Sequence, residues 1–358
     1  MVSRRVGSAM VKKKPFYAKK RFIIPIVIVG LVLLAFRVSP VPAASIVRVV
    51  FDSDARDKRT AMQAVVGEIN DVSVVSNISY RENDKHALLD IYTPQQEALG
   101  DSLLPVVIWT HGGAWLSGDK TDVTPYFKKL AQQGFVVVAL NYSLAPAKQY
   151  PHQAEQVNAA YGFVQKNIVD YKGDSSKLVL AGDSAGAQLS SQVAALTTNP
   201  SYAKEVGITP AIDPSNIAAL VLYCGIYKME DLAEPHANLS RIISWGNRTT
   251  VWSFTGSRTP SSDLIRQMSA YYHVDANFPD AFISGGNADP LTKAQSVPLS
   301  SKLQSLGVDV ETLFYEDDHE PAHSHENQFI LDEDGLKNFE TMADFIKRKT
   351  GVTSVGSE

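Results

Sequence analysis

Residues 178–186 read LVLAGDSAG, and this stretch decides the fold. The apolar run 178–181 is typical of a strand that is buried on both faces of a parallel sheet. The pentapeptide GDSAG at 182–186 fits the G-x-S-x-G pattern, a sharp turn from strand to helix that lifts a serine hydroxyl clear of the sheet. Small residues suited to a helix follow it. The stretch therefore predicts that Ser184 is a nucleophile.

The same alternation of strand and helix extends over residues 70–350. Apolar runs occupy 106–109, 136–140, 178–181, 219–223, 281–283 and 310–314, and helical segments occupy 124–133, 153–167, 185–197, 298–306 and 334–349. Two earlier runs, 72–75 and 87–92, flank a polar turn at 81–84 and predict an antiparallel pair. This order predicts an α/β fold, a mostly parallel sheet with helices on both faces.

Nearly sixty residues, 224–280, separate the sixth and seventh expected strands. Insertions of this length often form lids or caps over a site. We expect a cap between strands 6 and 7; an insertion that only packs on the sheet edge is the alternative.

A second motif, HGGAW at 111–115, directly follows the strand expected at 106–110. Glycine-rich loops in this position bind a developing oxyanion through backbone N–H groups. We expect an oxyanion hole built from Gly112, Gly113 and Ala114, with the N–H of Ala185 after the nucleophile as a further donor. His111 is expected to hold the loop.

The acid and the base of a triad should follow in chain order. Asp289 stands just after the strand at 281–283, where a carboxylate orients an imidazole. Three histidines come after the last strand, His319, His323 and His325, and the residues alone leave both His319 and His325 open as the base. Their spacing fits no zinc pattern well, so no metal is expected.

Four motifs together resemble one family: HGGAW at 111–115, NYSLAP at 141–146 with Tyr150-Pro151, GDSAG at 182–186 and GNADPL at 286–291. The chain resembles the esterase/lipase branch of the α/β hydrolases, which includes hormone-sensitive-lipase-like carboxylesterases and bacterial feruloyl and acetyl esterases. The resemblance implies an α/β-hydrolase fold and a triad of Ser184, Asp289 and a histidine.

The chain departs from that pattern at the histidine, which many relatives place directly before Gly-Phe. HENQF at 325–329 is more similar to the His-Glu-Tyr-Gln-Phe segment of a bacterial, often membrane-anchored subgroup. That resemblance favours His325 as the base, with His319 as the alternative.

The predicted activity is a serine carboxylesterase that cleaves short-to-medium acyl or aryl esters and needs no cofactor. A peptidase or amidase would use the same triad. A non-catalytic surface binding protein on the same fold is the alternative from another class. The net charge of −4 gives no basic excess for nucleic acid, and the single cysteine, Cys224, rules out an internal disulfide. The sequence does not predict an oligomeric state.

The N-terminal segment predicts attachment to a membrane. Residues 1–21 carry eight Lys or Arg and no acidic residue, and the uncharged run 22–36 follows. Fifteen helical residues reach about 22 Å, short of the roughly 30 Å hydrocarbon core. We expect a cytoplasmic basic segment (1–21), a single-pass anchor (22–38), a stalk or N-terminal helix (39–69) and an extracytoplasmic catalytic domain (70–350). Cleavage as a signal peptide, followed by secretion, is the alternative.

Overall fold

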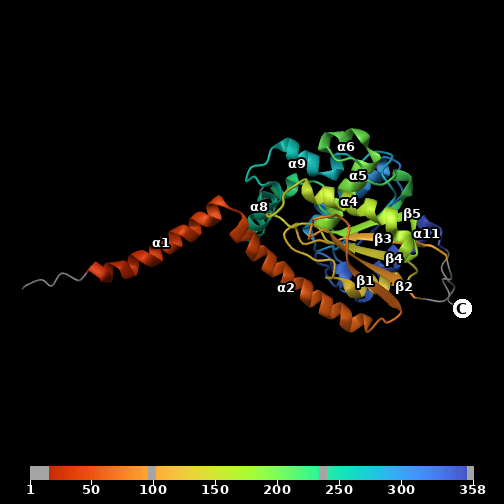
Figure 1. Cartoon of the computed structure of the whole chain (residues 1–358), viewed down its shortest axis with the longest axis horizontal. Coiled ribbons are helices and arrows are strands. Elements are labelled where there is room, and N and C mark those ends of the chain that lie inside the picture. Colours follow the sequence, from red (N-terminus) through yellow and green to blue (C-terminus); the bar gives the residue numbers. More distant parts are fainter. Residues whose placement is uncertain (1–15, 96–101, 234–239, 353–358) are drawn as a thin grey trace, which may run out of the picture.

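An eight-stranded sheet forms the centre of the computed structural model, which describes residues 16–95, 102–233 and 240–352 (Figure 1). The strand order is β1-β2-β4-β3-β5-β6-β7-β8. The outermost β1 is antiparallel to β2, β2 is antiparallel to β4, and every later pairing is parallel. The predicted α/β sheet and its antiparallel pair are confirmed. The strands are β1 Val72–Ser79, β2 Leu88–Pro94, β3 Leu104–Thr110, β4 Val136–Leu140, β5 Gly173–Asp183, β6 Ile217–Tyr223, β7 Ala281–Gly285 and β8 Val310–Phe314.

Helices cover both faces of the sheet, as predicted. Side chains alternate along each strand, so each central strand presents apolar groups to both layers of helices. In β5, Leu178 and Leu180 join the core formed with α4 and α5, whereas Val179 and Ala181 join the core formed with α3 and α11. The central strands are apolar on both faces for this reason. The helices that follow the strands are α3 Thr124–Ala131, α4 His152–Asn167, α5 Ala185–Thr198, α6 Pro200–Val206, α10 Val297–Ser305 and α11 Glu333–Thr350.

The insertion lies between β6 and β7 and contains α7 (Glu230–Ala233), α8 (Arg241–Thr255) and α9 (Ser262–Met268). The end of α8 is held by two contacts. The ring of Phe254 stacks on Trp115 at 4.4 Å between centroids, and its carbonyl accepts the N–H of Tyr150 at 2.9 Å. This helix is therefore fixed directly to the loop after β3.

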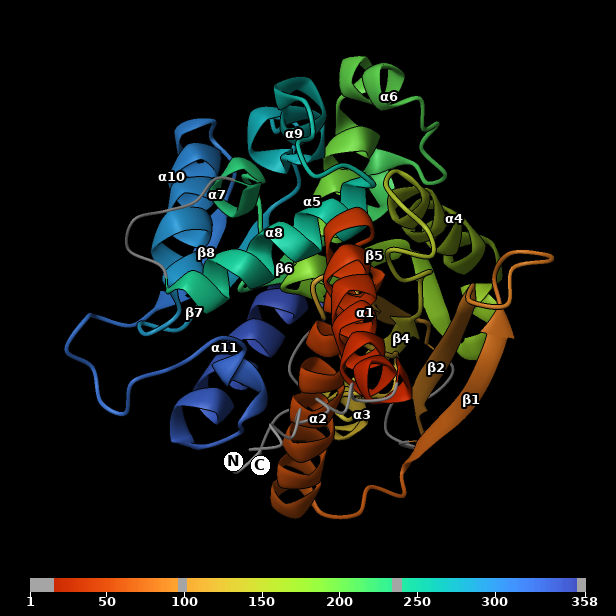
Figure 2. The same ribbon diagram turned by 90° about the vertical axis from the view of Figure 1, so that its left-hand side faces the viewer.

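Two helices precede the sheet, α1 (Phe16–Val38) and α2 (Val41–Val66). In Figures 1 and 2, α1 projects from the domain, and α2 runs along it. Contacts with α3 and α8 hold α2 against the domain, where Met62 is fully buried. The expected helix at 39–69 thus packs on the domain along its length.

No single helix within the described residues is both long and apolar enough to cross a membrane. The pair Ile24–Val38 and Val41–Val66 passes that test only together, with a bend of 82° between them. Of the basic segment predicted at 1–21, residues 1–15 lie outside the described residues.

Candidate active site

The predicted nucleophile lies at the turn between β5 and α5. Ser184 has φ 50° and ψ −117°, a conformation that L-residues rarely adopt, and its N–H donates to the carbonyl of Tyr223 at 2.8 Å. The turn requires glycine on both sides. A Cβ at Gly186 would lie 1.9 Å from the carbonyl oxygen of Thr110, and one at Gly182 would lie 2.6 Å from the backbone of Gly186.

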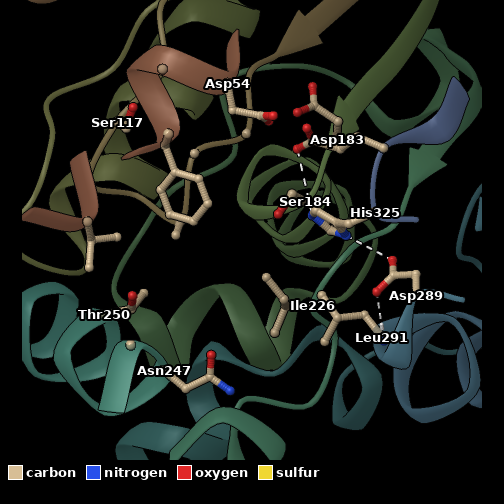
Figure 3. Close-up of a pocket in the computed structure, with 18 of the residues that line it drawn as sticks. Asp54, Ser117, Asp183, Ser184, Ile226, Asn247, Thr250, Asp289, Leu291 and His325 are labelled. Carbon is tan, nitrogen blue, oxygen red and sulfur yellow. Dashed lines mark hydrogen bonds and ion pairs between the residues drawn. The ribbon is translucent and has the colours of Figure 1, made fainter. Parts of the chain in front are cut away.

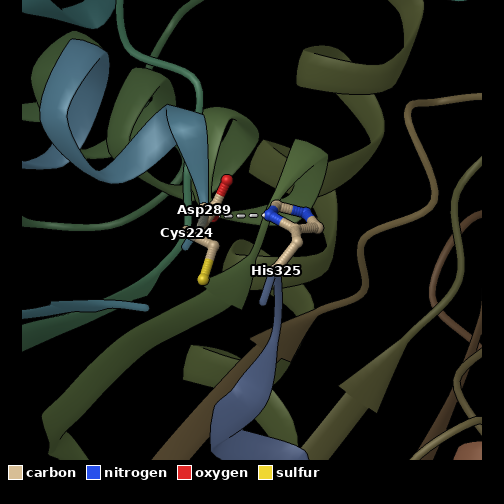
Figure 4. Close-up of side chains that lie close together, drawn as sticks. All are labelled: Cys224, Asp289 and His325. Carbon is tan, nitrogen blue, oxygen red and sulfur yellow. Dashed lines mark hydrogen bonds and ion pairs between the residues drawn. The ribbon is translucent and has the colours of Figure 1, made fainter. Parts of the chain in front are cut away.

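The predicted acid and base come together beside Ser184. Asp289 follows β7 and is 3% exposed, and its Oδ2 lies 2.8 Å from Nδ1 of His325 (Figure 4). Its Oδ1 accepts the N–H of Leu291 at 2.9 Å, so the carboxylate also caps the turn that follows. Figure 3 shows the imidazole of His325 next to Ser184, with Asp289 on its far side. The nucleophile, the base and the acid of a serine triad therefore lie next to one another.

The pKa of His325 is set by opposing effects. Burial disfavours the imidazolium, but the hydrogen bond to Asp289, the contact with Cys224 and the charge of Glu326 outweigh it and raise the pKa above its ordinary value. Burial raises the pKa of the Cys224 thiol, which keeps it in the neutral form. The thiol accepts the N–H of Glu326 at 3.4 Å and so supports the backbone after the base.

The other two histidines point elsewhere. Nε2 of His319 and Nε2 of His323 each lie 2.8 Å from Oδ2 of Asp334 at the start of α11. This double contact ties the base loop to the last helix, and His319 is not among the groups that meet at Ser184.

Two clusters bring together side chains of the kinds that bind metals: Cys224, Asp289 and His325, and the group His319, His323 and Asp334. In the first cluster, a metal ion would have to replace the hydrogen bond between Asp289 and His325. We therefore assign these three residues to the triad and its support.

The predicted oxyanion loop follows β3 and is held in an unusual conformation. Gly113, Ala114 and Trp115 all have positive φ, at 94°, 52° and 58°. Backbone N–H groups in a tight turn of this kind can converge on one concave site that binds an anion. The ring of His111 stacks on Tyr142 at 4.3 Å, and its Nδ1 lies 2.8 Å from the carbonyl of Gly112, in line with its expected structural role.

Gly112 differs from the other expected oxyanion donors because its backbone hydrogen-bonds to the carboxyl of Asp183. Gly113, Ala114 and Ala185 remain the expected N–H donors of the oxyanion hole. Asp183 also accepts the indole N–H of Trp109 at 2.7 Å.

A charged network that the sequence analysis missed surrounds the base. Nζ of Lys58, on α2, lies 2.8 Å from Oε2 of Glu326, whose Oε1 is 3.7 Å from Nε2 of His325. Burial raises the pKa of Asp183 to about 8, helped by the charge of Glu326, and this favours the protonated carboxyl. Burial would also raise the pKa of Glu326, but Lys58 outweighs it and lowers that pKa. Besides Asp289, the Glu326 carboxylate therefore places a second negative charge beside the base, and Lys58 offsets this second charge.

Glu326 stood in the sequence directly after the predicted base, yet nothing in the sequence pairs it with Lys58, 268 positions earlier. Asp183 is the second residue of GDSAG, but the motif alone does not show that its side chain is buried against Gly112.

The site lies at the base of a cavity of about 1190 Å³. The lining comes from α2, the oxyanion loop, α8 and the loops that carry the triad. Figure 3 shows Asn247 and Thr250 on one side of it, and Asp54 and Ser117 on the other. This volume exceeds the 300–1,000 Å³ typical of small-molecule sites.

Comparison with known proteins agrees with this geometry. The family model described as BD-FAE matches residues 89–303, more than half of the chain. Among curated proteins, the chain is similar to the esterase LipQ of Mycobacterium tuberculosis, with 28% identity over 65% of this chain and 53% of the relative. It is also similar to the carboxylesterase NlhH of that organism, with 30% identity over 58% of this chain and 63% of the relative. The chain spans about half the length of the first curated relatives that it matches.

Solved structures support the fold. Esterase B from Lactobacillus rhamnosis superposes with a TM-score of 0.73 at 20% identity, over 86% of this chain and 95% of that one. A hyperthermophilic esterase from Pyrobaculum calidifontis gives 0.65 at 22% identity, over 92% of this chain and 99% of that one.

Proposed function

Because the chain belongs to the BD-FAE family, we propose that it hydrolyses carboxylic esters through Ser184, His325 and Asp289. One observation carries this proposal: the strained Ser184 lies beside an imidazole whose other nitrogen is hydrogen-bonded to a buried carboxylate. The oxyanion loop and the names of the curated relatives support the same reaction.

The reaction proceeds in two halves. Oγ of Ser184 attacks the ester carbonyl carbon while Nε2 of His325 takes the hydroxyl proton. The N–H groups of Gly113, Ala114 and Ala185 stabilise the negative oxygen. The C–O bond then breaks, and the alcohol leaves with the proton from Nε2. Water attacks the acyl-enzyme with the same base, and the acid departs.

Asp289 holds the imidazole in the tautomer that presents Nε2 to the serine. The N-terminus of α5 adds its positive dipole end at Ala185, where the oxyanion forms. Both effects act without any cofactor.

The substrates we propose are short-to-medium acyl or aryl esters. The cavity that reaches Ser184 is lined largely by apolar side chains of α2 and α8, among them Phe51, Ile243 and Trp245. Such a lining suits an acyl chain or an aromatic ring.

The test uses purified full-length protein with a panel of p-nitrophenyl esters from acetate to laurate, and matched anilides. Ser184→Ala should lower kcat by at least about 10⁴-fold and abolish labelling by a fluorophosphonate probe. The same rate with Ser184→Ala as with the unmodified chain would refute the assignment. Faster anilide than ester turnover would favour an amidase.

We also propose that α1 anchors the chain in a membrane, with the basic residues before it in the cytoplasm and the catalytic domain outside. Between Ile24 and Val38, α1 is apolar apart from Arg37, and its side chains are exposed except for the half-buried Ala35 and Phe36. Recovery in the membrane pellet after alkaline carbonate washing would support anchoring. Recovery of a shortened chain in the medium would instead support cleavage and secretion.

A further inference from the structure

One wall of the cavity comes from α2, the helix that follows α1. Ile46, Val50, Phe51, Asp54 and Lys58 all line the cavity. Their spacing places them on one face of the helix, turned toward the site. The inner end of this face is charged where Lys58 meets Glu326, and its outer end is apolar. An acyl chain therefore has an apolar path along α2 away from the reacting carbon.

The outer end of this path is rimmed by exposed apolar side chains. On α2, Val49 is 67% exposed, and Ile46 and Val50 are also exposed; on α8, Ile242 is 80% exposed, and Ile243 stands beside it in the chain. We call these five residues the apolar rim. All but Val49 also line the cavity. A cluster of exposed aliphatic groups around a cavity mouth is typical of a surface that contacts a protein, a ligand or a membrane.

The apolar rim lies on the side of the domain from which α1 projects. In Figure 1, α1 leaves the domain at the end that carries α8, and Figure 2, seen from that end, shows α1 in front of α2 and α8. The end of α1 is tied there, because the Arg258 guanidinium after α8 donates to the carbonyl of Phe36 at 3.1 Å and stacks over Trp252 of α8 at 4.1 Å. An α1 embedded in lipid would hold the rim toward the lipid surface.

We propose that the apolar rim rests on a lipid surface and that the enzyme takes its ester from that surface, as an amphiphile whose acyl chain passes between α2 and α8. This inference rests on the ester hydrolysis proposed above. It accounts for two exposed features at once, the rim and the apolar α1, which lie at the same end of the molecule.

The test compares one leaving group in two settings. The full-length chain is reconstituted in phosphatidylcholine vesicles and given 4-methylumbelliferyl palmitate in the bilayer, or 4-methylumbelliferyl acetate in water. The rim variant Val41→Ser/Val49→Ser changes two exposed residues at the outer end of α2 that do not line the cavity. It should lower the ratio of palmitate to acetate turnover by about tenfold or more, because exposed hydroxyls replace aliphatic groups at the lipid contact. The matched control, Val75→Ser/Val169→Ser, changes two exposed aliphatic residues in β1 and after α4 and should leave the ratio unchanged.

An unchanged ratio in the rim variant would overturn the proposal. A dimer of the unmodified chain that the rim variant abolishes would also overturn it, because the rim would then be covered by a second copy. Acetate turnover by the unmodified chain distinguishes failure of the lipid proposal from failure of the proposed function. If the unmodified chain does not hydrolyse the acetate, the proposed ester hydrolysis itself is refuted.

Discussion

Replacing Lys58 with methionine is expected to move the acidic limb of the kcat/KM profile to higher pH by about one unit. Lys58 offsets the charge of Glu326, whose carboxylate lies 3.7 Å from Nε2 of His325. Methionine keeps most of the side-chain volume and removes the ammonium. The side chains of Asp289, Cys224 and Asp183, the other titratable groups around the imidazole, are unchanged. The shift requires that Glu326 stays ionised in the variant, because Lys58 holds the pKa of that carboxyl down against burial.

The magnitude follows from the distance. Opposite unit charges 3.7 Å apart attract by about 4 kcal/mol at an effective dielectric constant of ~20, which corresponds to about 3 pKa units. Lys58 cancels only part of this attraction, and the imidazole is 34% exposed, so water damps it further. About one unit is therefore expected. A raised pKa keeps His325 protonated, and inactive as a base, up to a higher pH. At a pH well below the midpoint, kcat/KM falls about tenfold, while the alkaline plateau is unchanged.

The assay is a pH series of kcat/KM on p-nitrophenyl butyrate, read at the isosbestic wavelength of the product. Lys58→Arg should keep the original midpoint because it keeps the charge. Lys349→Met is the matched control, since Lys349 pairs with Asp280 and Asp309 away from the site. A lower plateau with an unmoved midpoint in Lys58→Met would refute the electrostatic reasoning and leave Lys58 a purely structural contact.

Four further outcomes are expected. The unmodified chain should show an acidic midpoint above pH 6.5, because the pKa of His325 is raised, and a midpoint below 6 would contradict this. Asp289→Asn should lower kcat by about 10⁴-fold with little change in KM, measured on the same ester. Phe254→Ala should lower the free energy of unfolding by about 3–4 kcal/mol in urea titrations, since the ring is fully buried. Gly186→Ala should prevent folding, whereas Gly246→Ala, with open space at its Cβ, should raise the free energy of unfolding by about 0.5–1 kcal/mol. Equal stability of the two glycine variants would contradict the steric argument.

Most of the fold could be predicted from the sequence because central parallel strands carry no polar face. The runs at 106–109, 136–140 and 219–223 each lie within an observed strand. The ends of the strands were harder to predict than their centres. β5 begins at Gly173, five residues before the apolar run, because its polar start still pairs with Leu104 of β3.

The site could be predicted where a local motif fixes the backbone. Ser184 and Asp289 each follow a strand, so their position at the carboxyl edge of the sheet follows from the topology. The pairing of His325 with Asp289 could not be derived from the residues alone, because it depends on the path of a loop with little regular structure between β8 and α11. The resemblance to His-Glu-Tyr-Gln-Phe segments supplied that choice.

Contacts between residues far apart in the sequence could not be predicted. No periodicity in the N-terminal segment indicates that Lys58 contacts the residue after the base, and the sequence predicts only a stalk or N-terminal helix at 39–69. Its packing became visible only in three dimensions.

The position of α2 in the chain has a consequence for how such an enzyme diversifies. The helix that forms one wall of the cavity ends before β1 begins and lies outside the segment matched by the family, residues 89–303. Changes in the apolar residues at the outer end of this helix would shift no strand register and displace no triad residue. Selectivity at this wall can therefore change without altering the triad as long as Lys58, which pairs with Glu326 beside the base, is kept.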